Sequence, residues 1–191
     1  MKRLIVTSPL PPSVNHYCAR RYVTKNGRPM AINYKTKEAV HYQNEFKKTI
    51  RNAVIAQNWN TDLTNPRHFY VDANFYFDRV RKDPNNYWKC LLDAITETEL
   101  IWADDDIVCE RVNRIAYDAK NPRIELCIYY VDYIGIFDNE KQKDIFIETN
   151  CKTCKRFARN CTVLSGALEG KVQEGVTNTL CGKFSHSNKK E

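Results

Sequence analysis

The segment from Phe69 to Asp78 constrains the fold most, because apolar and polar side chains alternate along it without a break. This is the period of a β-strand with one buried face. Its apolar positions are Phe69, Val71, Ala73, Phe75 and Phe77. Two further alternating runs, 107–117 and 123–133, are joined by a turn-like stretch around 118–122. We therefore predict a small sheet in which these two runs pair as a hairpin.

Two other segments show the helical period. In residues 36–57 the apolar positions that fall on one side include Ala39, Tyr42, Phe46 and Ile50. In residues 84–97 the apolar stripe, spaced i, i+3, i+4 and i+7, is Trp88, Leu91, Leu92 and Ile95. Asp83 is a capping residue, and Pro84 suits the first helical position. Two helices packed on a small mixed sheet place this part of the chain in the α+β class.

Acidic and basic side chains gather around the second helix. Asn85, Lys89 and Asp93 are spaced to line one of its faces, and three successive carboxylates, Asp104 to Asp106, precede Ile107. Carboxylates crowded together raise each other's pKa, whereas a divalent metal turns the same crowding into a ligand set. The alternative is that Asp83 is only a helix cap and the acidic run only a solvated turn.

These residues resemble the RusA family of Holliday-junction resolvases, which are largely phage and prophage endonucleases. The resemblance lies in the order of a basic pair, Asp-Pro-x-Asn from Asp83, a lysine, Leu-Asp-Ala-Ile from Leu92, and Asp-Asp at 104–105. The segment Pro11-Pro-Ser-Val-Asn-His-Tyr17 is similar to the family's PPSxN loop. The resemblance covers about residues 4 to 131 and implies the RusA-like α+β fold there.

The resemblance also implies an activity and a site. It predicts a structure-specific endodeoxyribonuclease that resolves Holliday junctions and related branched DNA in recombination and repair, acting as a homodimer. Mg²⁺ or Mn²⁺ would be held by Asp83, Asn85, Asp104 and Asp105, and the catalytic residues would be Asp83, Lys89 and Asp105. The family usually has Asp where this chain has Asn85, so the site loses one negative charge. The alternative is a branched-DNA-binding protein whose nuclease activity has weakened at this position.

The charge balance favours a polyanionic partner. The 191-residue chain has a net charge of +7 and a pI near 8.9. Tyr17, Tyr22 and Tyr34 interleave with basic residues in the segment 15–35. We expect the cations to contact phosphates and the tyrosines to stack on unpaired bases. The predicted DNA-binding residues are Asn15, Arg20, Arg21, Lys25, Arg28, Arg81 and Lys82. The alternative is a solvated hairpin turning at Asn26-Gly27.

The carboxyl-terminal segment has a different composition, and we predict a domain of residues 1–135 followed by a basic, cysteine-rich segment, 136–191. Cys151 and Cys154 form a C-x-x-C pair, and Cys161 and Cys181 follow. Four thiolates suit tetrahedral zinc, so these residues predict a small structural zinc knuckle, with His186 as a spare candidate for the fourth ligand. The alternative is a disordered tail with reduced thiols.

No apolar run approaches the length that a bilayer requires, and the apolar core of the amino-terminal segment is too short for a secretion signal. We therefore expect a protein without membrane contact, in the cytoplasm of a bacterial or phage-infected cell. In that compartment the eight cysteines are expected to be thiols or metal ligands rather than disulfides.

Overall fold

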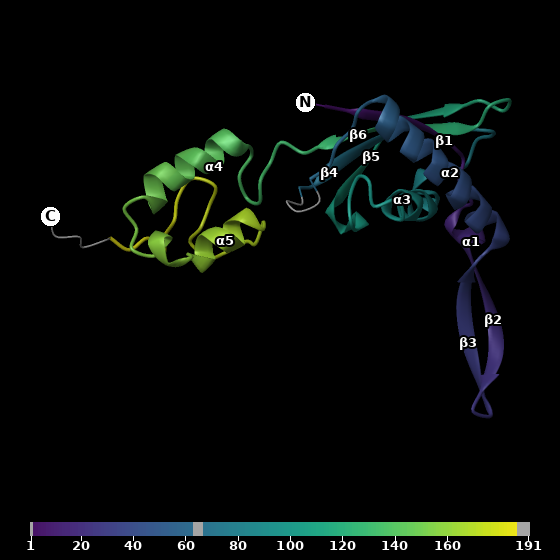
Figure 1. The fold of residues 1–191 in the computed structure, drawn as a ribbon, viewed down its shortest axis with the longest axis horizontal. Helices are drawn as coiled ribbons and strands as arrows, with labels where there is room; N and C mark the ends of the chain where they lie inside the picture. The colour runs from purple at the N-terminus through teal and green to yellow at the C-terminus, as the bar shows by residue number, and fades with distance from the viewer. Residues whose placement is uncertain (1, 63–66, 187–191) are drawn as a thin grey trace. The chain divides into compact units, whose positions relative to one another are not determined.

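The computed structural model describes residues 2–62 and 67–186. The chain divides into two compact units, Met1–Tyr130 (unit 1) and Val131–Glu191 (unit 2), which are described separately (Figure 1). The division falls a few residues before the expected domain boundary. None of the helices in the described ranges has the length and apolar content needed to span a bilayer.

Unit 1 is built on a four-stranded mixed sheet in the order β1-β6-β4-β5. The strands are β1 (Leu4–Pro9), β4 (Phe69–Phe77), β5 (Val108–Tyr117) and β6 (Arg123–Tyr130). β4 pairs in parallel with β5, while β6 is antiparallel to both β1 and β4. Every second residue of β4 is buried, as its alternation predicts. The α+β class with a small mixed sheet is confirmed for this unit.

The predicted hairpin between the last two alternating runs is wrong. β5 and β6 each pair with β4, which lies between them, and the connection crosses the end of β4, where the Asp118 backbone N–H donates to the Phe77 carbonyl at 2.7 Å. Alternation identifies a strand but not its partner. One face of β4 is buried along its whole length, and a central position in the sheet gives that face the most complete burial.

Helices α2 (Lys37–Ala56) and α3 (Trp88–Thr96) cover the buried face of the sheet. The Thr36 hydroxyl caps α2 by accepting from the Ala39 N–H at 3.2 Å. The remaining helical segments of unit 1 are short: α1 (Val14–Tyr17), the 3-10 turn η1 (Pro84–Asn86) and the 3-10 turn η2 (Asp105–Ile107). The core joins β4 to both helices, and Phe75 meets Trp88 of α3 edge to face at 5.6 Å.

Strands β2 (Cys18–Lys25) and β3 (Arg28–Lys35) form a separate two-stranded hairpin. Asn26 and Gly27 connect them with φ of 52° and 75°, the left-handed backbone that a two-residue type I′ turn requires. Figure 1 shows this β2–β3 hairpin extending away from the sheet of unit 1. Most of its side chains are exposed.

Unit 2 is helical and has a small core. Its elements are α4 (Glu140–Phe146), the π-helical segment η3 (Ile147–Cys151), the 3-10 turn η4 (Phe157–Arg159) and α5 (Thr162–Leu168). The buried residues that form its core are Phe137, Phe146, Cys151, Ala167 and Val176. The alternative of a disordered tail is therefore wrong for residues 131–186, which the structure describes as a folded unit.

Candidate active site

The segment that leads into α3 begins with the predicted cap. The Asp83 carboxylate accepts a hydrogen bond from the Asn85 backbone N–H at 3.0 Å, and Pro84 is buried. The first turn is a 3-10 turn rather than α-helix, and α3 itself starts at Trp88. The side chains of Asp83 and Asn85 remain exposed, so their oxygen atoms are accessible.

Lys89 and Asp93 lie one turn apart on α3 and form an ion pair. The distance from Lys89 Nζ to Asp93 Oδ1 is 2.8 Å, and this hydrogen bond raises the pKa of Lys89. The side chain of Lys89 is 60% exposed and that of Asp93 19% exposed. Asp93 thus holds the ammonium group of a lysine whose side chain is largely exposed.

A tyrosine from the amino-terminal loop fixes Asp93 in turn. The Tyr17 hydroxyl donates to Asp93 Oδ2, and the Gln43 side-chain amide donates to the Tyr17 oxygen at 3.4 Å. Tyr17 is only 4% exposed, and burial, followed by the bond to Asp93, raises its pKa. The expected role of Tyr17 in stacking on a base is therefore wrong, because its ring is packed in the core.

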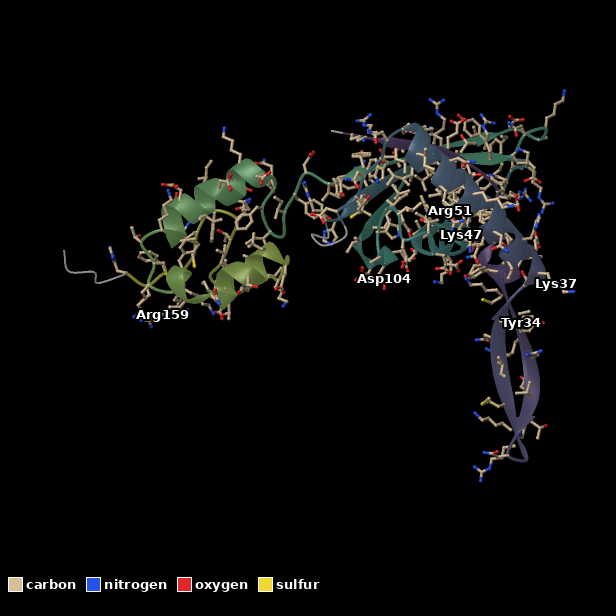
Figure 2. All side chains as sticks on the ribbon, viewed as in Figure 1. Tyr34, Lys37, Lys47, Arg51, Asp104 and Arg159 are labelled. Carbon is tan, nitrogen blue, oxygen red and sulfur yellow. The ribbon has the colours of Figure 1, made fainter. Side chains whose placement is uncertain are left out.

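The acidic run is anchored by the residues before it. Ile101 and Trp102 are buried, and the Trp102 indole N–H donates to the Thr96 hydroxyl at the end of α3 at 2.8 Å. Asp104 follows as an exposed residue, marked in Figure 2, and Asp105 is half-buried at the start of η2. The hydrogen bond from Trp102 to Thr96 therefore keeps Asp104 and Asp105 beside the end of α3.

Asp105 is the point where the charged groups converge. Burial raises the pKa of Asp105, Lys89 opposes that rise, and Asp93 and Asp104 add to it. Asp104 raises the pKa of Asp105 both as a hydrogen-bond partner and as a neighbouring negative charge. We call Lys89, Asp93, Asp104 and Asp105 the acidic site.

The structure brings together Lys89, Asp104 and Asp105 of the predicted set and adds Asp93 to them. Asp83 forms its local cap bond, and Asn85 follows it on the same turn. That Asp83 and Asn85 share a cation with Asp104 and Asp105 stays a prediction.

The donor atoms of this region suit a hard divalent cation, since carboxylate and amide oxygens are the ligands that Mg²⁺ prefers. Within residues 2–62 and 67–186, however, no three His, Cys, Asp or Glu side chains are arranged as a group that could hold a metal ion. A Mg²⁺ ion bound here would therefore receive only part of its coordination shell from the protein. Mg²⁺ commonly binds through one or two carboxylates and takes its remaining ligands from water and substrate phosphate.

Two acidic residues near this region were missed from the sequence. Burial and the neighbouring Asp105 raise the pKa of Glu110 on β5. Glu97, just after α3, bridges Lys35 at 2.6 Å and Lys47 at 2.7 Å. The position of Glu110 in the sequence could have indicated its place near the site, because it lies three residues after Ile107, near the start of the strand that follows the acidic run.

The predicted DNA-binding residues lie in three places. Asn15 is exposed on α1, Arg81 is exposed with a left-handed φ of 63°, and Lys82 forms an ion pair with Asp78 at 2.5 Å. The other four, Arg20, Arg21, Lys25 and Arg28, are exposed on the β2–β3 hairpin. Figure 2 marks Tyr34 on the same hairpin.

The register of the β2–β3 hairpin places three of these cations on one face. Arg21 pairs with Ile32, and Lys25 pairs with Arg28 beside the turn, so all of these share a face with Tyr34. The Arg21 guanidinium lies 5.6 Å from the centre of the Tyr34 ring. Arg20, on the opposite face, donates to the Asn33 side-chain oxygen at 3.2 Å. One face therefore combines positive charge with an exposed aromatic ring.

In unit 2 the four predicted zinc residues line one small cavity, although they do not form a metal-ligand group as they stand. Burial, together with the neighbouring Cys161, Cys181 and Cys154 thiols, raises the pKa of Cys151 to about 11. Burial also raises the pKa of Cys154, but backbone N–H groups that donate to its sulfur lower it below the usual value. Zinc binding stays a prediction.

Comparison with known proteins agrees with the geometry of unit 1. A search of curated proteins finds no significant match. A family model, described as endodeoxyribonuclease RusA, matches residues 9–129. This span is more than half of the chain and includes the amino-terminal loop, the β2–β3 hairpin, α3 and the acidic site. The chain therefore belongs to the RusA family of endodeoxyribonucleases.

Proposed function

We propose that this protein is a metal-dependent, structure-specific endonuclease that cuts Holliday junctions and related branched DNA by phosphodiester hydrolysis. The observation that carries the proposal is the acidic site, in which Lys89, Asp104 and Asp105 converge inside the span that matches the family. Because an enzyme that cuts two strands of a junction separates the joined duplexes, the protein would act in DNA recombination and repair.

Asp83, Asn85, Asp104 and Asp105 would hold Mg²⁺ or Mn²⁺. When bound, such a cation supplies positive charge at the phosphate oxygens and acidifies water for attack. Asn85 would contribute a neutral oxygen in place of a carboxylate, which lowers the charge of the ligand set. The raised pKa of Asp105 supports this arrangement, because a cation relieves the repulsion among the crowded carboxylates.

Lys89 would act on the scissile phosphate. Its side chain is exposed and its ammonium group is held by Asp93, so it would present a positioned positive charge to developing negative charge on the phosphate. Tyr17 holds the other oxygen of Asp93 and restricts the rotation of that carboxylate. The hydrogen bonds from Tyr17 to Asp93 and from Lys89 to Asp93 thus position the Lys89 ammonium group. Of these three residues, only Lys89 would touch the DNA.

The β2–β3 hairpin would hold the DNA. Arg21, Lys25 and Arg28 share a face that can follow a phosphate backbone, and Tyr34 on that face is 46% exposed, so its ring can stack on an unpaired base. Arg20 would add a contact from the opposite face of the hairpin, and Asn15, Arg81 and Lys82 would add contacts outside it. Affinity that depends on these cations falls as salt rises, since phosphate contacts release counterions.

A four-way junction has two equivalent strands to cut, and a homodimer matches that two-fold symmetry with two equivalent sites. We propose this assembly for the DNA-bound protein. Light scattering of the protein with and without a synthetic junction measures it directly, and a single copy on the junction would contradict it.

A cleavage assay tests the proposed function. Labelled four-way, three-way and linear duplex DNA of matched sequence are incubated with the full chain in Mg²⁺, in Mn²⁺ and in EDTA. We expect paired cuts in the four-way junction with either metal, weaker cutting of the three-way junction, and intact linear duplex. Equal cutting of all three substrates, or cutting that survives EDTA, contradicts the proposal.

A second candidate function rests on Asn85, which stands where the family usually has aspartate. The protein would then be a branched-DNA-binding protein with weakened catalysis. The Asn85→Asp variant separates the two candidates. Cleavage that rises from undetectable to robust favours weakened catalysis, whereas a wild type that already cuts favours the enzyme.

A further inference from the structure

We propose that unit 2 binds a structural zinc ion through Cys151, Cys154, Cys161 and Cys181. The four residues come from three segments of the unit, yet all four line one small cavity. Four thiolates match the soft, tetrahedral coordination that zinc takes in structural sites.

The backbone around the C-x-x-C pair has a turn that suits thiolate ligands. The Cys154 N–H donates to the Cys151 carbonyl at 2.8 Å, which closes the turn between them. Backbone N–H groups of Ser185, Arg156 and Phe157 near the Cys154 sulfur help to lower the pKa of this thiol. Hydrogen bonds to the charged form of a thiol favour that form, and the thiolate is the form that binds metal.

A buried polar side chain fixes the fourth cysteine beside the first. Asn150 is only 7% exposed, and its side-chain oxygen accepts from the Cys181 backbone N–H at 3.1 Å. Its amide donates to the Phe146 carbonyl at 3.2 Å and to the Thr179 carbonyl at 3.1 Å. These bonds tie the segment of Cys181 to the residue that precedes Cys151, so both ends of the proposed ligand set are held by backbone.

The small size of unit 2 is a further argument for such a ligand. Below about 70–80 residues a hydrophobic core alone rarely suffices, and small units add disulfides or a metal. The core of unit 2 is small, and one of its buried members is Cys151 itself. All eight cysteines of the chain are free thiols.

Binding requires the sulfur atoms to turn inward, because no three of the described side chains form a ligand group as they stand. Each cysteine has one side-chain torsion before its sulfur, so the proposal requires that changes of rotamer alone bring the four sulfur atoms together. His186 forms a backbone bridge with Cys154 and is the competing fourth ligand.

The test uses the full chain purified under reducing conditions. We expect about one zinc per chain by elemental analysis, zinc release on titration with a mercurial thiol reagent, and a thiolate-to-metal charge-transfer band after Co²⁺ replaces zinc. Cys154→Ser and Cys181→Ser should each lose the zinc, and Cys18→Ser, an exposed cysteine of β2, should keep it. Chelation should lower the unfolding temperature of unit 2.

Each of several results would overturn the proposal. They are a wild-type protein that carries no zinc and gives no charge-transfer band with Co²⁺, and zinc that persists in Cys154→Ser. Zinc lost from His186→Ala but kept in Cys161→Ser would replace the four-cysteine set with three cysteines and a histidine. The wild-type Co²⁺ spectrum decides the question even if the variants fail to fold.

Discussion

The acidic site and the β2–β3 hairpin belong to the same unit, but they are held in opposite ways. The acidic site is fixed by buried side chains, through Tyr17 on one side and Trp102 on the other. The hairpin is fixed by its own ladder and by its two-residue turn, and most of its side chains are in solvent. This difference fits the two proposed roles. Groups that act on a phosphate must be held rigidly, whereas groups that bind a DNA backbone must extend from the protein surface.

The largest effect that separates the two regions is expected from Asp105→Asn. The variant removes the charge of a proposed metal ligand, and since even outer-shell changes at metal sites cost about 10- to 100-fold, we expect junction cleavage to fall by at least about 100-fold. Junction binding, measured by gel shift in Ca²⁺, should stay at the wild-type level. Asp106→Asn, an exposed neighbour, is the matched control and should cut normally. An active Asp105→Asn variant would remove Asp105 from the site.

The next effect concerns the hairpin. Replacing Arg21, Lys25 and Arg28 together by alanine should weaken junction binding and reduce the slope of log affinity against log salt by about 3. Cleavage at saturating protein should change little, because the acidic site is intact. Fluorescence anisotropy at several salt concentrations measures the slope.

A control with the same loss of charge uses three exposed cations elsewhere in unit 1, Lys48, Arg51 and Lys120. Their replacement should leave the slope close to that of the wild type. Equal slopes in the two triple variants would show that the hairpin has no special part in binding.

Tyr17→Phe should have a smaller and purely catalytic effect. The variant keeps the packed ring but removes the hydroxyl that holds Asp93, so Lys89 loses a fixed anchor. We expect kcat to fall about tenfold, the lower end for loss of an outer hydrogen bond, with KM unchanged. Tyr22→Phe, at a tyrosine that is 74% exposed on the hairpin, is the control. A change confined to KM would argue against a positioning role.

The smallest effect is expected at the hairpin turn. Gly27→Ala places a side chain at a φ of 75°, a strain of about 1–2 kcal/mol, although nothing lies within 4 Å of the added atom. Because the hairpin lies outside the core, the unfolding temperature of unit 1 should barely shift while binding weakens slightly. Calorimetry compares the unfolding of Gly27→Ala with that of Phe75→Ala, a change in the buried core expected to lower the free energy of unfolding by about 3–5 kcal/mol. Equal shifts would mean that the hairpin and the core unfold as one.

Local features of the fold were predictable from sequence, and distant pairings were not. The alternation of β4, the cap at Asp83 and the stripe of α3 depend on neighbouring residues, and all are present. The place of β4 between β5 and β6 depends on which strand buries its face best, and alternation does not encode that choice. The failed hairpin between residues 107 and 133 follows from this.

The candidate site divides in the same way. The family motifs pointed to Asp104, Asp105 and Lys89, which do converge. The hydroxyl of Tyr17 reaches Asp93 across 76 residues of chain, and no local periodicity signals such a contact. Tyr17 was therefore assigned to stacking, although its position in the core makes it a support for the acidic site.

In the proposed site, carboxylates from two segments of the chain share one cation. Protein cleavage by bound Fe²⁺ with ascorbate and peroxide tests this sharing, because radicals formed at the ion cut the backbone next to it. We expect cuts both near Asp83 and near Asp104–Asp105, and both should disappear together as Mg²⁺ displaces Fe²⁺. Cuts at only one of the two segments, or cuts that Mg²⁺ does not suppress, would contradict it.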